Sequence, residues 1–301
     1  MRPDGLPRPG RPLRSRSGQP QDDLGPAHPL RRGRPDRDRA RGRLPQLRGG
    51  RLHQGPAGRD DPGRGLSRGP CGRGLTMSSN VYEDDTIVAN EIAGGRHREL
   101  IGGLWDEMGP HQMAFLKGQG LQPHHRLMDI GCGALRLGTL AVDYLDAGRY
   151  FGSDISESLM RTGYDLELSE EGRSKTPWSH FRASPDFDLP DTDSPVDFAI
   201  AQSVFTHLPL NHLRRCLARL APKMAPGGRF FVTYFECRPD QNLFDTLVQP
   251  GGIVRTRDTL DPFHYRLDDL VWAIDQAPWT FEPIGDWGHA RGQMVCAYRR
   301  R

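Results

Sequence analysis

The stretch from Leu127 to Gly138, LMDIGCGALRLG, constrains the fold more than any other part of the chain. Apolar residues lead to Asp129, Gly131 and Gly133 flank Cys132, and a helix-forming run follows. This order predicts a buried β-strand that ends in a tight glycine turn and then opens a helix. Glycine suits such a turn because the backbone must bend sharply and can then lie directly against a ligand. We therefore expect an α/β domain with a binding site at this turn.

The spacing of the glycines narrows the class of ligand. A dinucleotide-binding turn follows the pattern G-x-G-x-x-G, which places the diphosphate on a helix N-terminus. Here Gly138 comes five positions after Gly133, and Asp129 lies two residues before the first glycine. A carboxylate at that position suits a cationic ligand better than a phosphate. These two features disfavour a nicotinamide-dependent oxidoreductase.

A second acidic residue follows at a distance typical of ribose recognition. The segment RYFGSDI, residues 149–155, predicts a second strand that ends at Asp154, about 20 residues after the glycine turn. With these two motifs the chain resembles the class I S-adenosylmethionine-dependent methyltransferases. DIGCG resembles the first motif of that family, and SDIS resembles its ribose-binding acid. The segment from Ala225 to Phe235, a PGG turn followed by an aromatic strand, resembles the family's fifth strand.

The resemblance implies a fold and a cofactor. The expected fold is α/β and doubly wound, with a mostly parallel seven-stranded sheet, an antiparallel last strand and a helical N-terminal lid over residues 77–120. The implied cofactor is S-adenosylmethionine, with Ser184 or Asp186 near its adenine amino group. Cys132 is expected to pack at the strand end rather than to act as a nucleophile. The expected cofactor-binding residues are Asp129, Gly131, Cys132, Gly133, Asp154, Ile155, Ser184, Asp186 and Gln202.

Two histidines are candidates for catalysis. His207 follows the apolar segment 196–201, which predicts a central strand, and its imidazole could take a proton from an attacking hydroxyl or amine. The alternative is that His207 caps the next helix or orders the loop. His289 lies in a polar turn, residues 286–293, between two strands of an expected hairpin, and a plain hairpin loop is the alternative there.

The acceptor site is expected on the later part of the chain. Residues 236–265 contain several prolines and glycines, and a loop of this length in a small domain is usually functional. In the resembling family an insertion here commonly builds the acceptor pocket. The expected acceptor contacts are Glu236, His264, Tyr265 and Arg291.

The remaining elements are expected at the following places. The third strand is expected over residues 178–183, and a helix from Ser156 to about Glu170 is expected to be stopped by Gly172. Further helices are expected over residues 210–224 and 266–276, and the last hairpin over residues 279–287 and 293–298.

The composition divides the chain at Met77. Residues 1–76 hold 18 Arg, 7 Asp and neither Lys nor Glu, a net charge of +11, and they lack Ile, Val, Phe, Tyr, Trp and Asn. Such a segment cannot bury enough apolar surface to fold, so we expect a disordered Arg/Gly/Pro-rich tail. One hypothesis is that this segment is a basic arm that binds nucleic acid. The other is that it is untranslated GC-rich sequence read as protein, and that the natural protein starts at Met77. Residues 77–301 form the expected methyltransferase domain and carry 23 basic and 31 acidic residues, a net charge of −8.

These observations favour methyl transfer from S-adenosylmethionine to an O or N nucleophile of a small molecule, such as a sugar or secondary metabolite. The second hypothesis is a protein or RNA methyltransferase. Nucleic acid is not expected as a partner, because an acidic domain is poorly suited to bind a phosphate backbone. A nucleic-acid-binding protein that works through the Arg-rich tail is the third. The sequence shows no metal-ligand spacing, signal peptide or membrane span, which indicates a cytoplasmic protein without a metal. Its oligomeric state stays open.

Overall fold

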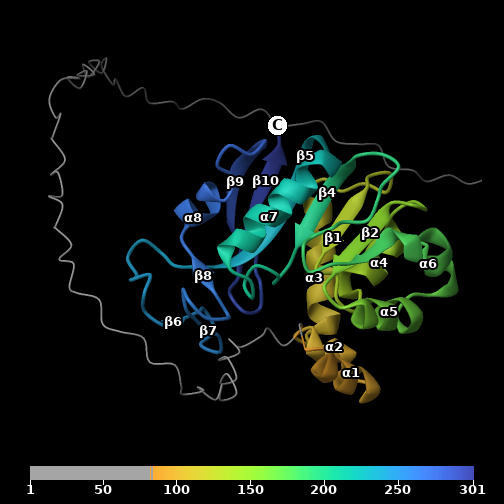
Figure 1. The fold of residues 1–301 in the computed structure, drawn as a ribbon, viewed down its shortest axis with the longest axis horizontal. Helices are drawn as coiled ribbons and strands as arrows, with labels where there is room; N and C mark the ends of the chain where they lie inside the picture. Colours follow the sequence, from red (N-terminus) through yellow and green to blue (C-terminus); the bar gives the residue numbers. More distant parts are fainter. Residues whose placement is uncertain (1–81, 83) are drawn as a thin grey trace, which may run out of the picture. The chain divides into compact units, whose positions relative to one another are not determined.

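A computed structural model describes Tyr82 and residues 84–301. Its centre is a sheet in the order β3-β2-β1-β4-β5-β10-β9 (Figure 1). The first five strands pair in parallel, and β10 runs antiparallel to both of its neighbours. The doubly wound sheet and its antiparallel last strand are therefore confirmed. The strands are β1 (Leu127–Ile130), β2 (Tyr150–Asp154), β3 (Phe181–Ala183), β4 (Val196–Ala201), β5 (Met224–Glu236), β9 (Trp279–Asp286) and β10 (Met294–Arg300).

Each face of the sheet has its own apolar core, because successive strand residues point to opposite faces. In β10, Val295 and Ala297 pack with α3 (Trp105–Gly118), α4 (Arg136–Tyr144) and α5 (Glu157–Leu166). Cys296 and Tyr298 pack instead with α7 (Leu210–Leu220) and α8 (Leu267–Trp272). The strands are thus buried on both faces, and the carboxyl ends of the parallel strands form an open edge for a ligand.

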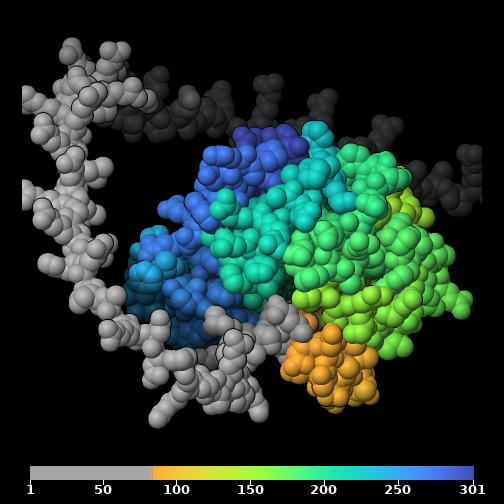
Figure 2. All heavy atoms as spheres, in the orientation of Figure 1, coloured from red at the N-terminus to blue at the C-terminus, as the bar shows by residue number. Residues whose placement is uncertain are grey.

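Three helices precede the sheet, in the segment where the sequence predicted helical structure: α1 (Asp85–Ala93), α2 (His97–Leu100) and α3. Both α1 and α2 pack against α5, and α3 packs against α4. The orange surface of α1 and α2 borders the yellow-green surface of the neighbouring helices in Figure 2. Glu167, just after α5, accepts hydrogen bonds from Arg98 at 2.6 and 2.8 Å and lies 2.6 Å from His97. The expected tail and residues 77–81 and 83 of the expected lid lie outside the described residues.

Several element boundaries differ from expectation. Gly172 does not stop the helix after β2, because α5 already ends at Leu166 and Gly172 lies inside α6 (Glu170–Lys175), which the Ser169 hydroxyl caps. Residues 178–180 form a 3-10 turn, so β3 begins only at Phe181. The residues of the PGG turn belong to a long β5 that changes register against β4. The last helix, α8, covers residues 267–272 of the expected 266–276.

The segment after β5 contains three short strands rather than an unstructured loop. β6 (Leu247–Val248) and β7 (Arg255–Thr256) form a small antiparallel pair, and β8 (His264–Tyr265) adds an eighth strand in parallel to the end of β5. This segment therefore begins and ends at the sheet. Within residues 84–301, no helix has both the length and the apolar character needed to cross a lipid bilayer.

Candidate active site

The glycine turn after β1 has the backbone shape that the sequence predicted. Gly131 and Gly133 have φ values of +72° and +53°, which strain any residue with a Cβ. The third positive φ, +65°, falls on Leu135, whose side chain is fully buried in the core beside α4. A Cβ on Gly131 would strike Val204, and one on Gly133 would lie 2.8 Å from Ile101. The turn therefore brings bare main chain to the open edge of the sheet.

Asp154, at the end of β2, is tied directly to this turn. Its two carboxylate oxygens accept hydrogen bonds from the backbone N–H of Gly133 at 2.9 Å and of Ser156 at 3.0 Å. Burial raises the pKa of Asp154, and these N–H donors oppose the rise. Each oxygen keeps a lone pair that can accept a further hydrogen bond. The carboxylate is thus held in one orientation with capacity to bind a pair of hydroxyl groups.

Asp129 lies beneath the turn, and its side chain is almost fully buried. Its carboxyl accepts a hydrogen bond from the Tyr150 hydroxyl at 2.8 Å. Burial raises the pKa of Asp129 to about 7, although the Tyr150 hydrogen bond acts in the opposite direction. Burial therefore favours the protonated form of Asp129, and a cation nearby would favour the ionised form.

The raised pKa of Asp129 predicts a specific pH dependence of stability. Between the unfolded value of about 3.9 and the folded value of about 7, the native state holds a proton that the unfolded state releases. The contribution of this group, up to roughly 4 kcal/mol, is complete below about pH 4 and is lost as the pH rises through 7. Asp129→Asn keeps an acceptor for Tyr150 and should raise the melting temperature at pH 8 relative to wild type, with little effect at pH 4. An equal effect at both pH values would contradict a buried, titrating Asp129.

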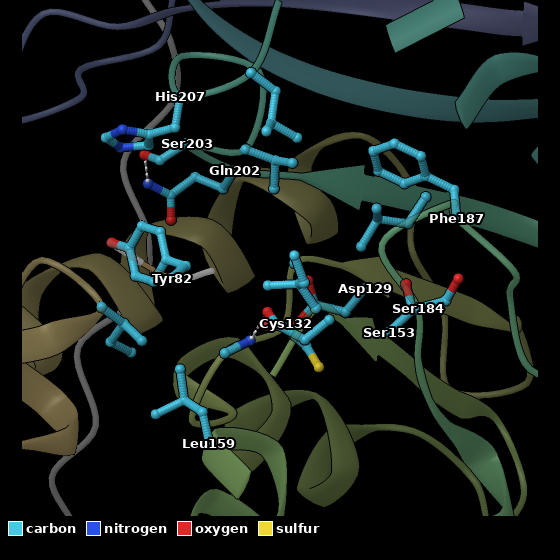
Figure 3. Close-up of a pocket in the computed structure, with 18 of the residues that line it drawn as sticks. Tyr82, Asp129, Cys132, Ser153, Leu159, Ser184, Phe187, Gln202, Ser203 and His207 are labelled. Atoms are coloured by element: carbon cyan, nitrogen blue, oxygen red, sulfur yellow. Dashed lines mark hydrogen bonds between the residues drawn. The ribbon is translucent and has the colours of Figure 1, made fainter. Parts of the chain in front are cut away.

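The far end of the site is formed by the loop after β3. Ser184 accepts hydrogen bonds from the backbone N–H of Asp186 and of Asp188, both at 3.1 Å, which fixes the loop. Asp186 forms an ion pair with Arg215 of α7. Phe187 has a φ of +58° and is 9% exposed, so its ring forms an apolar wall there. Figure 3 shows Ser184 and Phe187 on the opposite side of the site from Tyr82.

A buried polar network holds the loop after β4. Ser203 has a φ of +61°, and its backbone N–H donates to the Thr233 hydroxyl at 2.7 Å. The Gln293 amide lies 2.8 Å from the Ser203 hydroxyl and accepts from Thr233 at 2.7 Å. Gln202 then donates to Ser203 at 2.7 Å and accepts from Arg136 at 2.7 Å. The network fixes the left-handed turn that directs residues 202–207 over the sheet edge.

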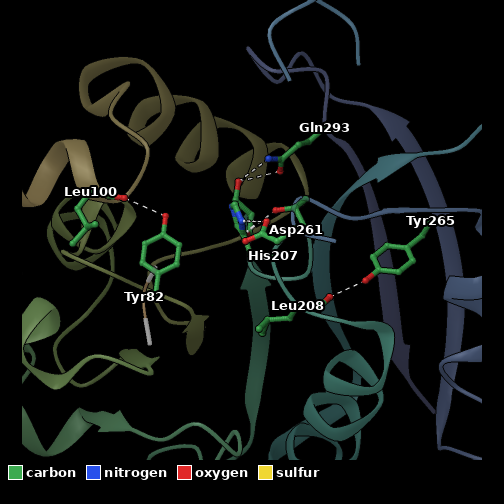
Figure 4. A network of polar contacts seen from close by, with 9 residues as sticks. Tyr82, Leu100, His207, Leu208, Asp261, Tyr265 and Gln293 are labelled. Atoms are coloured by element: carbon green, nitrogen blue, oxygen red, sulfur yellow. Dashed lines mark hydrogen bonds and ion pairs between the residues drawn. The ribbon is translucent and has the colours of Figure 1, made fainter. Parts of the chain in front are cut away.

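His207 forms a pair with Asp261, 54 residues later in the chain. The Nδ1 atom of His207 lies 2.7 Å from an Asp261 carboxylate oxygen (Figure 4). With a proton on Nδ1, the ring carries its lone pair on Nε2, the atom that could accept a proton. The Tyr82 ring meets the imidazole edge-on at 5.9 Å. A carboxylate that orients a histidine is the arrangement expected of a general base.

His289 is placed differently. It is 7% exposed, and its ring stacks on Trp287. Its Nδ1 accepts from the backbone N–H of Arg291 at 3.1 Å, and its Nε2 lies 3.2 Å from the amide nitrogen of Gln202. Burial lowers the pKa of His289 to about 4, so the ring is neutral at physiological pH. A neutral ring has one nitrogen lone pair, and the Arg291 N–H uses the one on Nδ1. Nε2 of His289 therefore carries a proton and has no lone pair with which to take a proton from an acceptor.

The other expected acceptor residues lie away from the glycine turn. The His264 ring contacts the Thr256 hydroxyl at 2.9 Å and the Leu243 carbonyl at 2.8 Å. The Tyr265 hydroxyl donates to the Leu208 carbonyl at 2.7 Å (Figure 4). Glu236 ends β5 opposite Tyr265, and the Arg291 guanidinium donates to the Gly102 carbonyl at 2.6 Å. These four residues remain candidates by prediction, and none of them lines the cavity described next.

One cavity of about 340 Å³ at the sheet edge joins most of the expected residues. Its volume falls in the range of small-molecule sites, about 300–1,000 Å³. All nine expected cofactor residues line it, and so does His207. Cys132 contributes as a packed thiol, since burial raises its pKa. The sequence analysis missed five polar lining residues from helical segments: Tyr82, Gln112, Arg136, His212 and Arg215. A polar residue on an otherwise apolar helical face was the available signal for Gln112.

A family model described as a methyltransferase domain matches residues 128–230. The matched range begins in β1 and ends in β5, so it includes the glycine turn, Asp154, Ser184, Asp186 and His207. These are the elements that line most of the cavity.

Solved structures share the fold at low sequence identity. Human N-acetylserotonin methyltransferase in complex with S-adenosylmethionine is 16% identical, with a TM-score of 0.50 over 72% of this chain and 59% of that chain. Magnesium protoporphyrin IX methyltransferase from Synechocystis with bound S-adenosylmethionine is also 16% identical, with a TM-score of 0.49 over 75% of this chain and 99% of that chain. At this identity the likeness concerns the fold.

Proposed function

Because the chain carries a class I methyltransferase domain and is an S-adenosylmethionine-dependent methyltransferase, we propose that it methylates an O or N nucleophile of a small-molecule acceptor. The observation that carries the proposal is the His207–Asp261 pair at the same cavity as the glycine turn and Asp154. The cavity thus combines a base with a donor site.

The residues at the cavity fit the cofactor. We assign the ribose hydroxyls to Asp154, whose oxygens each keep an acceptor lone pair, and the adenine end to Ser184, Asp186 and the Phe187 wall. Gly131 and Gly133 have no Cβ, so their backbone could contact the methionine portion directly. The cofactor supplies a methyl group already activated by a positively charged sulfur. The protein's task is therefore to position the acceptor, exclude water and remove a proton.

The acceptor would enter beside His207. In this arrangement Nε2 of His207 would take the proton from the acceptor hydroxyl or amine. The acceptor oxygen or nitrogen would gain the methyl group, and the sulfur of the cofactor would keep the electron pair of the broken carbon–sulfur bond. Asp261 keeps the imidazole in the required tautomer and stabilises the imidazolium that forms. The Tyr82 ring packs edge-on against the imidazole and lines this part of the cavity, where an aromatic surface would help to exclude water from the reacting groups.

The size of the cavity, about 340 Å³, and the charge of the domain favour a small molecule over a polymer. A polymer would need an extended groove, and a nucleic acid would also need basic surface, whereas residues 77–301 carry a net charge of −8. The neighbour with the TM-score of 0.50 is named for N-acetylserotonin, which is itself a small molecule. We therefore propose a sugar or secondary metabolite as the acceptor, with a protein or RNA substrate as the second hypothesis.

The test is methyl transfer by the full chain. Radiolabelled S-adenosylmethionine would be incubated with a panel of hydroxylated and amino-bearing metabolites, and in parallel with total RNA and a cell protein extract. Label in a small-molecule product, lost on adding excess S-adenosylhomocysteine, is the expected result. Label only in RNA or protein would overturn the small-molecule proposal and leave the methyltransferase assignment intact.

A further inference from the structure

His207 lies between two backbone carbonyls that the segment after β5 holds in place. The Thr206 carbonyl accepts a hydrogen bond from the Phe263 N–H at 2.7 Å. The Leu208 carbonyl accepts a hydrogen bond from the Tyr265 hydroxyl, also at 2.7 Å (Figure 4). The backbone on each side of His207 is therefore fixed by one segment that lies far away in the sequence.

The same segment also supplies the partner of the imidazole. Asp261, Phe263 and Tyr265 are alternate residues, and the Asp261 carboxylate lies 2.7 Å from Nδ1 of His207. The side chains of His207 and Asp261 are 31% and 37% exposed. A pair at the surface is weak by itself, because water competes for both groups and their side chains must be ordered. The geometry of this pair therefore depends on how firmly the surrounding backbone is held.

Tyr265 has a rigid environment. It is 7% exposed, and its ring stacks on Phe263 with the ring centroids 6.3 Å apart. Its carbonyl accepts a hydrogen bond from the Cys237 N–H at 2.9 Å, next to the pairing of β8 with the end of β5. Burial raises the pKa of the Tyr265 hydroxyl, so this group stays protonated and remains a donor. Tyr265 thus connects the Leu208 carbonyl to the central sheet.

We propose that Tyr265 is a positioning residue for methyl transfer, whose hydroxyl acts on His207 through the Leu208 carbonyl. By fixing that carbonyl, Tyr265 keeps the imidazole in contact with Asp261. The ring proton then stays on Nδ1, and Nε2 is free to take a proton from the acceptor. Tyr265 does not line the cavity, so it acts through His207 and not on the acceptor. The inference rests on the proposed role of His207 as the general base.

NMR of the full chain with ¹⁵N-labelled histidine tests the inference without an acceptor. The spectrum distinguishes a ring protonated on Nδ1 from one protonated on Nε2, and His207→Ala identifies the signals of His207. At about pH 8, where a free imidazole is neutral, we expect the Nδ1-protonated form in wild type. Tyr265→Phe should shift the ratio of the two forms about 3- to 10-fold toward the Nε2-protonated form, as expected for the loss of one neutral hydrogen bond. Asp261→Leu removes the carboxylate and defines the full extent of the shift.

Methyl transfer to the identified acceptor provides a second measurement. The single-turnover rate of Tyr265→Phe should fall about 3- to 10-fold, while the KM for the acceptor and the affinity for S-adenosylhomocysteine stay within about 2-fold of wild type. A raised KM for the acceptor together with an unchanged tautomer of His207 would indicate that Tyr265 contacts the acceptor, and it would overturn the proposal.

Tyr298→Phe is the matched control. The Tyr298 hydroxyl donates to the Leu270 carbonyl at 3.1 Å, in the same apolar core as Tyr265 but outside the loop after β4. This variant should lose about as much stability as Tyr265→Phe, with the tautomer of His207 and the turnover unchanged. An unchanged tautomer in Tyr265→Phe, or an equal shift in Tyr298→Phe, would overturn the proposal. An Nε2-protonated His207 in wild type would instead count against His207 as the general base, and the inference would fail with it.

Discussion

Replacing Asp154 with alanine should lower the affinity for S-adenosylhomocysteine by roughly 10²- to 10⁴-fold. The carboxylate would form two hydrogen bonds to the ribose hydroxyls, and each hydrogen bond to a charged group contributes about 1.5–3 kcal/mol. The substitution also leaves the Gly133 N–H without the acceptor that now lies at 2.9 Å. Calorimetric titration at neutral pH measures the effect directly.

Asp188→Ala is the appropriate control for Asp154→Ala. Asp188 also follows a parallel strand and carries the same charge, but it is exposed and lies outside the cavity lining. The Asp188→Ala variant should bind S-adenosylhomocysteine with an affinity within about 3-fold of wild type, because the ion pair that Asp188 forms with Arg219 is on the surface. If Asp154→Ala folds and binds as tightly as wild type, Asp154 does not hold the ribose.

His207→Ala should reduce the turnover number by roughly 10²- to 10⁴-fold, the range for loss of a general base. Affinity for S-adenosylhomocysteine should change little, because the proposed donor contacts lie at Asp154 and the glycine turn. Asp261→Asn should reduce turnover less, since the imidazole remains and loses only the carboxylate that orients it. Single-turnover methyl transfer to the identified acceptor separates this chemical step from product release.

His289→Ala distinguishes the two histidine candidates. We expect a smaller loss than in His207→Ala, because the one lone pair of the neutral His289 ring already accepts from the Arg291 N–H. A larger loss in His289→Ala than in His207→Ala would reverse the assignment. Normal turnover in His207→Ala would reduce His207 to a loop residue and indicate that positioning alone drives the reaction.

The donor half of the site could be predicted from sequence because its residues act locally. Gly131 and Gly133 were recognisable since a sharp turn needs positive φ, and Asp154 was recognisable since it ends the next strand. Parallel strands with buried faces have continuous apolar sequences, so the ends of β1, β2 and β4 could be located within a few residues. The carboxyl ends of such strands share one edge, which is why nine expected residues line one cavity.

Boundaries that depend on packing were harder to predict. Gly172 looked like a helix stop, yet it lies inside α6, where its backbone N–H donates to the Ser169 hydroxyl that caps the helix. His264 and Tyr265 were expected as acceptor contacts because they lie in the insertion after β5. In the fold they contact the carbonyls of Leu243 and Leu208, since buried backbone oxygens need donors, and their role at the acceptor stays a prediction.

The sequence by itself determined the doubly wound sheet, the glycine turn and the acid that faces it, because periodicity and turn chemistry act over a few neighbouring residues. Only the tertiary structure decided which side chains meet across the site. Asp261 reaches His207 across 54 residues, and Arg136 reaches the Gly103 carbonyl across 33. Contacts between distant segments depend on how the inserted loop and the N-terminal helices pack against the sheet. A pattern over a few neighbouring residues does not predict that packing.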